Sequence, residues 1–525
     1  MERIPMPSLL IRDFSAGKNS RLPGNLIPDN AVQDILNWEF NVNGGPKTRN
    51  GTSKYNPIAV GAGGAITGMF LCKYNDGTRK FVVSEGTELH VDAAGVFSSI
   101  KTGLTNGQYP QMAMLANLAV FVNGAEAPQK YNGTTVSDLG GSPPADPSII
   151  CAHRNHLFMA GASADPSKIT ACAVNTPEDW TTPNDSWTGY CGYQDGDPPI
   201  AFLSFMDTFL YVFKRQAIWR ILGSTGNSSS ANVFTPERVA FLTGTVARFS
   251  VVSIGSDAFF YDVEGIKSLA DTERAAGIEY PNLTFNIQND IIGLKTQNYS
   301  MFYGVNHKTK SQYWLAVAEP GQTNNNIVIV LDYSLRTPGP AGTLLPAATI
   351  FKFTEPKNII SLALIEATTG QDILYAGSHD GYIYQLDTGT NDNESAFTKR
   401  LKTKAYDLNL PNIYKNFPYL FSRIKQGANG SFTLNIKWDL DSEVETGGSY
   451  DMTIASAGTK WGAKKWGQFK WGAKRVTAKD ICLPQYGRTI GQNIAFTFTN
   501  TGKDEPIEIQ EFVLQGEPVG VLGPK

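Results

Sequence analysis

The sequence predicts a mainly β protein: a β-propeller of about seven units (six to eight), with an N-terminal arm and helix before it and a C-terminal β-sandwich after it. Glycine and proline together number 80 of 525 residues, and this share of about 15% exceeds the ~12% of average chains. Such a composition favours strands joined by tight turns. Between residues 58 and 395 a pattern of turn, apolar strand, turn and aromatic strand keeps returning. After residue 395 the strands become longer.

The overall charge is nearly neutral, since 45 Lys and Arg residues oppose 48 Asp and Glu residues. With 41% hydrophobic and 18% charged residues, the chain can bury a large core, and wholesale disorder is excluded. No apolar run approaches the ~18 residues of a membrane helix. The first residues lack the basic and apolar regions of a secretory signal. We therefore expect folding and assembly in a cytoplasm.

Residues 1–57 read as an irregular arm followed by a short helix that begins near Pro28. Val32, Ile35 and Leu36 lie at i, i+3 and i+4, so a helix would carry them on one apolar stripe, with Trp38 at its end. An arm with one helix has no core of its own. We therefore expect this helix to dock on the rest of the chain or on a partner, and deletion of the arm to leave the propeller folded but to prevent assembly.

The repeat between residues 58 and 395 predicts the propeller. Seven equivalent strand positions recur about every 49 residues, and four-stranded propeller blades recur at roughly 40 to 50 residues. These positions are Phe81, Leu118, Leu157, Phe209, Phe259, Trp314 and Ile373. A run of unrelated hairpins in two β-sandwiches is the alternative.

Residues 396–525 are predicted to form a separate β-sandwich. Within it Asp439, Asp441, Glu443 and Glu445 alternate at period two, which would place four carboxylates on one strand face. Like charges in a row need water or cations beside them. We interpret this acidic stripe as facing a channel or a subunit seam, with a solvated sheet edge as the alternative.

Three Trp-Gly units at a spacing of five residues form a basic and aromatic segment at 460–475. A spacing of five fits neither a helix face nor a strand face, so the segment is expected to project from the sandwich. It could contact another subunit, DNA or a lipid headgroup surface. The simplest alternative is a protruding loop whose tryptophans pack on a neighbouring subunit while its lysines stay solvated. Its members are Lys460, Trp461, Lys464, Lys465, Trp466, Lys470, Trp471, Lys474 and Arg475.

Motifs for catalysis, nucleotide binding and metal binding are missing from the sequence. Cys151, His153 and His156 form one small cluster, which we interpret as a core thiol and two ordinary histidines. The acidic run from Asp387 to Glu394 fails the spacing of a calcium loop and reads as a solvated linker. Five cysteines without a C-x-x-C pair predict buried thiols. We expect no enzyme activity, cofactor or metal.

The N-terminal arm resembles the opening of tail proteins of tailed bacteriophages. The resemblance rests on Asp13-Phe-Ser-Ala-Gly-Lys-Asn-Ser, on Pro28-Asp-Asn-Ala-Val-Gln-Asp-Ile-Leu-Asn-Trp and on Gly44-Gly-Pro-Lys-Thr-Arg-Asn-Gly-Thr52. It is strongest with the tail nozzle, or tail hub, proteins of short-tailed phages, and beyond the arm it covers only the order of domains. Where that group tends to have Arg-Pro-Gly, this chain has Arg49-Asn50-Gly51.

The resemblance implies a structural virion protein without catalytic residues. It would form a ring, a homohexamer, that docks below the portal and adaptor rings, closes the DNA channel and opens for DNA ejection. Its partners would be other copies of itself, the portal-adaptor ring, tail fibres or spikes, phage DNA and the host envelope. A carbohydrate-binding or carbohydrate-cleaving propeller and a cellular scaffold propeller are the alternatives.

Overall fold

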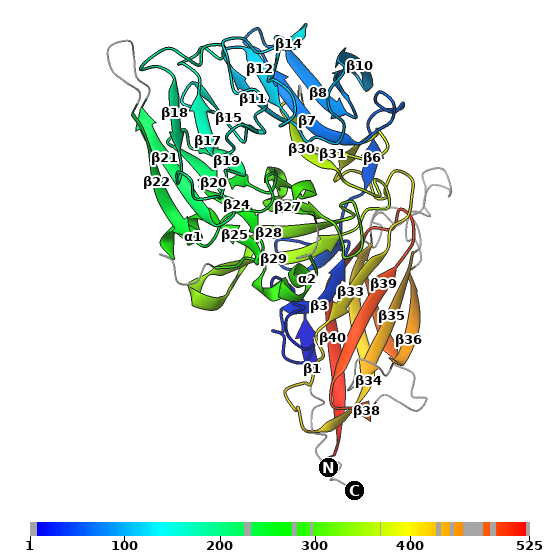
Figure 1. Cartoon of the computed structure of the whole chain (residues 1–525). Helices are drawn as coiled ribbons and strands as arrows, with labels where there is room; N and C mark the ends of the chain where they lie inside the picture. The colour runs from blue at the N-terminus through cyan, green and yellow to red at the C-terminus, as the bar shows by residue number, and fades with distance from the viewer. Residues whose placement is uncertain are drawn as a thin grey trace.

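The computed structural model describes residues 8–224, 233–275, 281–294, 298–367, 369–426, 432–440, 446–454, 476–482 and 490–520 (Figure 1). Strands dominate. In these ranges the α-helices are two short ones, α1 (Leu269–Arg274) and α2 (Gln288–Leu294), and neither is long and apolar enough to span a membrane. Four short 3-10 turns accompany them, η1 (Phe285–Ile287), η2 (Tyr299–Met301), η3 (Lys308–Lys310) and η4 (Pro340–Gly342).

Seven successive antiparallel units occupy the region predicted to repeat. The first two are β7 (Ile66–Lys73), β8 (Arg79–Glu85), β9 (Glu88–Ala93) and β10 (Val96–Lys101), then β11 (Gln111–Leu115), β12 (Leu118–Val122), β13 (Gln129–Tyr131) and β14 (Val136–Asp138). The next two are β15 (Ile149–His153), β16 (His156–Ala160), β17 (Lys168–Ala171) and β18 (Trp187–Tyr190), then β19 (Ala201–Phe205), β20 (Phe209–Phe213), β21 (Ala217–Ser224) and β22 (Val233–Phe241).

The last three units differ from this plan of four consecutive strands in a sheet of their own. The fifth has three strands, β23 (Val252–Ile254), β24 (Asp257–Asp262) and β25 (Gly265–Ser268), and the sixth has β26 (Tyr303–His307), β27 (Gln312–Val317), β28 (Ile327–Pro338) and β29 (Leu344–Phe351). The seventh joins β30 (Ser361–Glu366), β31 (Asp372–Gly377) and β32 (Ile383–Leu386) to β6 (Thr52–Lys54).

The seven units close into a ring. The first strand of each unit contacts the first strand of the next, in the order β7, β11, β15, β19, β23, β26 and β30, and β30 returns to β7. First strands that neighbour one another all the way round must line a common axis. The fold is therefore a mainly β one with a propeller of seven units, and this part of the predicted fold class is confirmed.

The ring closes with a strand from the start of the chain. Strand β6 pairs antiparallel with β32, so that Thr52 faces Leu386 and Lys54 faces Tyr384. Residues about 330 positions apart thus complete one blade. The end of the predicted arm is therefore a strand of the folded propeller.

The predicted docking helix is wrong, because its residues form β3 (Ala31–Leu36) and the start of β4 (Trp38–Phe40). Strand β3 pairs with β33 (Lys399–Thr403), and a β-bulge shifts the register between Val32 and Asp34. A bulge adds one residue to a strand, so Val32 and Ile35 both face inward although they are three residues apart. Apolar residues three positions apart are also typical of a helix, so the sequence pattern could not distinguish the two.

The C-terminal strands form two sheets, and both include strands from the N-terminus. One contains β37 (Val476–Cys482), β34 (Tyr414–Gln426), β40 (Ile507–Gly520), β5 (Pro46–Thr48) and β4, with β1 (Ser8–Ile11) on β40 and β38 (Ile490–Gly491) on β34. The other contains β2 (Gly17–Lys18), β3, β33, β39 (Ile494–Asn500), β35 (Phe432–Leu440) and β36 (Thr446–Ile454). Residues 396–525 therefore do not form a sandwich by themselves, because sheet pairing crosses the predicted boundaries.

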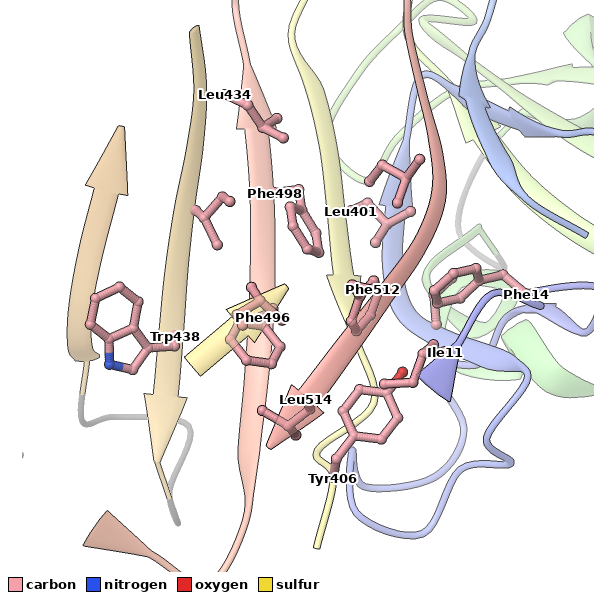
Figure 2. Packing of buried hydrophobic residues seen from close by; sticks show 14 of the residues in the cluster. Ile11, Phe14, Leu401, Tyr406, Leu434, Trp438, Phe496, Phe498, Phe512 and Leu514 are labelled. Atoms are coloured by element: carbon pink, nitrogen blue, oxygen red, sulfur yellow. The ribbon is translucent and has the colours of Figure 1, made fainter. Parts of the chain in front are cut away.

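One buried hydrophobic cluster draws on both sheets (Figure 2). Phe14 from the arm lies 6.0 Å from Phe512 of β40, and Phe512 lies 5.7 Å from Phe498 of β39, measured between ring centroids. Val32, Ile35 and Trp38 belong to the same cluster and are fully buried. Burial of this apolar surface holds the arm against the C-terminal strands.

A single hydrogen-bonded sheet connects the propeller with the C-terminal part. Strand β29 of the sixth unit pairs in parallel with β2 and β3, and the ten-stranded order runs from β26 through β29, β2, β3 and β33 to β36. Gly17 permits this pairing, because a Cβ at this position would lie 2.5 Å from the backbone nitrogen of Ala348. The two parts are therefore joined by a continuous sheet and not by a flexible linker.

Candidate assembly site at the propeller junction

A buried ion pair lies where the arm, the propeller and the C-terminal sheets meet. Arg49, directly after β5, donates from Nη1 and Nη2 to the two carboxylate oxygens of Asp392, each at 2.8 Å. Both side chains are at most 1% exposed. Arg49 also donates from Nε to Oδ1 of Asn37 at 2.8 Å. A bidentate pair of this kind fixes the geometry of its two segments as well as their distance.

Aromatic rings complete the surroundings of Arg49. Its guanidinium carbon lies 3.9 Å from the ring centroid of Phe397 and 4.2 Å from that of Phe353. Oδ2 of Asp392 additionally accepts from the backbone N–H of Thr354 at 2.8 Å. The hydrogen bonds and ring contacts compensate the desolvation of the two charges.

A second set of charges lies at the same junction. Lys310 of η3 contacts Glu39 of β4 at 2.9 Å and Asp387 at 2.5 Å, and Nε2 of His307 lies 2.9 Å from the other oxygen of Asp387. Burial opposes ionisation of Asp387, but the hydrogen bond to His307 and the charge of Lys310 outweigh it and lower the pKa of this carboxyl. Burial likewise opposes the charge of Lys310, while Glu39 and Asp387 raise its pKa. Both partners are therefore charged.

The acidic run from Asp387 to Glu394 was predicted to be a solvated linker, and for two of its carboxylates this is wrong. Asp392 is fully buried against Arg49, and the side chain of Asp387 is 15% exposed between Lys310 and His307. The partners come from segments 77 to 343 residues away. Nothing in the local sequence could reveal them.

The predicted docking residues are not available to a partner. Val32, Ile35 and Trp38 are fully buried, and Leu36, at the end of β3, is half-buried. They hold the arm in this chain's own core. The predicted docking surface is therefore not on the outside of the described chain.

A charged groove of about 730 Å³ is lined by residues of β2, β3, β33 and α2 and of the segment 20–23. Lys18 contacts Asp290 at 2.9 Å and Asp34 at 3.3 Å. Burial opposes ionisation of Asp34, but the charges of Lys18 and Arg400 outweigh it and lower its pKa. Lys18, Asp34, Asp290 and Arg400 are therefore paired with one another, whereas Arg21, which also lines the groove, lies over the ring of Phe285.

One member of the acidic stripe can be placed. Asp439 lies near the end of β35 on the face opposite the buried Trp438, and its carboxylate lies 3.7 Å from Nζ of Lys402. This is the outer face of the ten-stranded sheet, beside the charged groove. Asp441, Glu443 and Glu445 lie outside the described residues, so the stripe stays a prediction.

The basic and aromatic segment at 460–475 also lies outside the described residues. Its expected projection toward a partner stays a prediction. Strand β36, before this segment, ends at Ile454 and lies at the edge of the ten-stranded sheet. Strand β37, after it, begins at Val476 and lies at the edge of the other C-terminal sheet.

The small cysteine and histidine cluster is structural. Nδ1 of His153 lies 2.9 Å from Oγ of Ser204, and Nδ1 of His156 lies 2.6 Å from the carbonyl oxygen of Cys172. Burial raises the pKa of Cys151 to about 11 and lowers that of His153 to about 4. A thiol with a raised pKa is a poor nucleophile, an imidazole with a lowered pKa is a weak base, and Cys151 makes no hydrogen bond to either histidine. No group of three metal-ligating side chains occurs among the residues that the structure describes.

Comparison with known proteins adds distant structural likenesses. No protein-family model matches the chain, and no curated protein matches it significantly in sequence. Among solved structures, BamB from Moraxella catarrhalis is similar over 67% of this chain and 95% of its own, with 11% identity and a TM-score of 0.37. BBS1N, solved in complex with ARL6DN, is similar over 66% of this chain and all of its own, with 12% identity and a TM-score of 0.41. Likenesses at this level say nothing about activity or partners.

Proposed function

We propose that this chain is a structural subunit of a virion tail, a nozzle or hub protein that forms a homohexameric ring below the portal-adaptor ring. The proposal rests on the resemblance of the arm and of the domain order to tail proteins of short-tailed phages. In this role the ring closes the DNA channel and opens when the genome is ejected into the host. Tail fibres or spikes, the phage DNA and the host envelope are its further partners.

The observation that supports a mechanical role best is the connection between the propeller and the C-terminal sheets. A continuous ten-stranded sheet and a buried bidentate ion pair hold the two parts in one orientation. A ring subunit has to keep its shape when neighbours press on it, and main-chain pairing supplies that stiffness. The surfaces that contact neighbouring subunits would then be the charged groove and the Trp-Gly segment.

Oligomeric state tests this proposal. Mass photometry of the full chain over a range of concentrations should show a species of about six times the 57.1 kDa of one chain. Negative-stain images of that species should show a closed ring with a central opening. The ring should also bind phage particles that carry the adaptor and not particles that lack it.

A matched pair of variants locates the contact surface. Lys402→Glu changes a charge in the groove, whereas Lys503→Glu changes an exposed charge in the turn after β39 that does not line the groove. We expect the first to weaken ring formation or docking and the second to leave both unchanged. A protein that stays monomeric at all concentrations, and does not bind adaptor-bearing particles, would refute the proposal.

A further inference from the structure

A pocket of about 570 Å³ lies at one end of the propeller axis. It is lined by residues from the stretches 107–109, 246–249 and 298–301, together with Asn123 and Ile200. Most of these stretches lead directly into the first strands of the second, fourth, fifth and sixth units. The pocket is therefore built by several units around the axis. Its volume lies within the ~300–1,000 Å³ typical of pockets that bind small molecules.

Arg248 brings one positive charge to this pocket. It donates from Nη1 to the carbonyl oxygen of Ser148 at 2.7 Å and from Nη2 to the hydroxyl oxygen of Ser148 at 3.2 Å. Both acceptors are neutral, and no described carboxylate lies within ion-pair distance of the guanidinium. Burial lowers the pKa of Arg248 to about 10, so it remains charged at neutral pH. A charge that has lost water without gaining a counter-charge favours an anion beside it.

One wall of the pocket is aromatic. The ring of Phe249 stacks on that of Tyr303, with centroids 4.8 Å apart and an interplanar angle of 5°, and the ring of Tyr109 lies 6.1 Å from that of Phe249. Flat apolar surfaces of this kind bind the C–H face of a sugar ring. They provide little for a compact inorganic anion.

Polar groups of the pocket remain available to a ligand. In the part of the chain that the structure describes, the side-chain amide of Gln108 and the hydroxyl of Tyr109 make no hydrogen bond. Asn298 uses its Oδ1 to accept from Ser300 and leaves its Nδ2 donor unused by the described residues. The pocket thus combines one cation, an aromatic wall and neutral hydrogen-bonding groups.

We propose that this axial pocket binds an acidic sugar, with the sugar carboxylate on Arg248 and the pyranose ring against Tyr109 and Phe249. A uronate carries each complementary feature: one carboxylate, a C–H face and several hydroxyl groups. A neutral sugar would leave the guanidinium without a counter-charge. Inorganic phosphate would leave the aromatic wall unused.

Arg248 also joins the fifth unit to Ser148 at the start of the third unit, so it could act only as a structural contact. The structural role and the binding role require different contacts of Arg248. A structural contact needs both hydrogen bonds to Ser148, whereas an anion site needs the charge of Arg248 to face the pocket. Variants at the two residues separate these roles.

Calorimetric titration of the full chain with glucuronate tests the proposal. We expect saturable binding at millimolar concentrations that weakens with added salt, and at least about tenfold weaker binding of glucose. Arg248→Gln should lower the affinity for glucuronate at least about tenfold, because a charge-assisted hydrogen bond is lost. Ser148→Ala keeps the guanidinium in place and should change the affinity less than about twofold. Inorganic phosphate should not displace glucuronate at equal concentration.

Several outcomes would overturn the proposal. Glucuronate binding that is absent, or unchanged in Arg248→Gln, would leave Arg248 as a structural contact. Equal binding of glucose or effective competition by phosphate would refute the acidic sugar as ligand. If Arg248→Gln does not fold, Tyr109→Ala provides the decision, since it removes the ring contact without touching Ser148; undiminished glucuronate binding by that variant would also overturn the proposal.

Discussion

Arg49 and Asp392 form a fully buried, bidentate ion pair across 343 positions of the sequence. Arg49 stands between β5 of the C-terminal sheets and β6 of the propeller, and Asp392 follows the last propeller strand. The pair therefore ties together the two crossings of the chain between the propeller and the C-terminal sheets. Loss of the pair should therefore destabilise both the propeller and the C-terminal sheets.

Breaking this pair should be strongly destabilising. In Arg49→Met the carboxylate of Asp392 stays buried without its partner, and removing one member of a buried pair costs about 3–5 kcal/mol. Urea unfolding of the full chain should show that loss. Lys352→Met is the matched control, because Lys352 pairs with Glu319 on the exposed side of the same junction and such pairs contribute about 0–1 kcal/mol. Equal effects of both variants would contradict the assigned role.

Removal of residues 1–57 should unfold more than an arm. The deletion takes away β6, which completes the seventh unit, and the buried side chains of Val32, Ile35 and Trp38. Because the edge of β32 and part of a core would be exposed, we expect loss of the cooperative thermal transition and rapid proteolysis of the propeller. Removal of residues 1–7 should leave both unchanged, since every described strand remains. A folded propeller after the longer deletion would restore the sequence-based expectation of a separable arm.

Stability should fall at acidic pH partly through His153. Burial lowers its pKa from 6.5 to about 4. Between these values the unfolded chain binds a proton that the folded chain does not bind, so the free energy of unfolding decreases as the pH falls. The contribution of this residue reaches about 3 kcal/mol near pH 4.

His153→Gln should remove that part of the pH dependence. Urea unfolding at pH 7 and pH 4.5 should show a smaller difference for the variant than for the wild type. His379→Gln is the control, because His379 lies exposed in a turn. An unchanged difference in His153→Gln would show that His153 does not stay neutral in the folded chain.

The sequence predicted the ring of blades well and the junction poorly, for a physical reason. Strand alternation and turn residues are local, so Phe81, Leu157 and Trp314 could be recognised as equivalent positions. The bulge at Val32 depends on pairing with β33, about 370 residues away, and no local pattern distinguishes it from a helical stripe. Arg248 gave no signal at all, because only ring closure brings it to Ser148.

The acidic stripe should affect DNA passage if it lines a channel or seam. Replacing Asp439, Asp441, Glu443 and Glu445 by Lys would turn a surface that repels phosphate into one that binds it. We expect slow or arrested DNA ejection in particles that carry the variant, without unfolding of the C-terminal sheets. Asp439→Asn alone is the control, since it removes only the contact with Lys402. Normal ejection by the fourfold variant would refute the channel or seam role.

The three tryptophans of the Trp-Gly segment should contribute to assembly and not to monomer stability. Glycine after each tryptophan lets the indole lie flat against a partner surface, while the neighbouring lysines keep the free segment soluble. Replacing Trp461, Trp466 and Trp471 by Ser should therefore leave the melting temperature of the monomer nearly unchanged and reduce ring formation or infection. Trp438→Ser is the reference, because Trp438 is 2% exposed in the core and its truncation should cost about 3–5 kcal/mol. A loss of that size in the triple variant would show that these tryptophans belong to the core, and the partner contact would have to be sought in the charged groove.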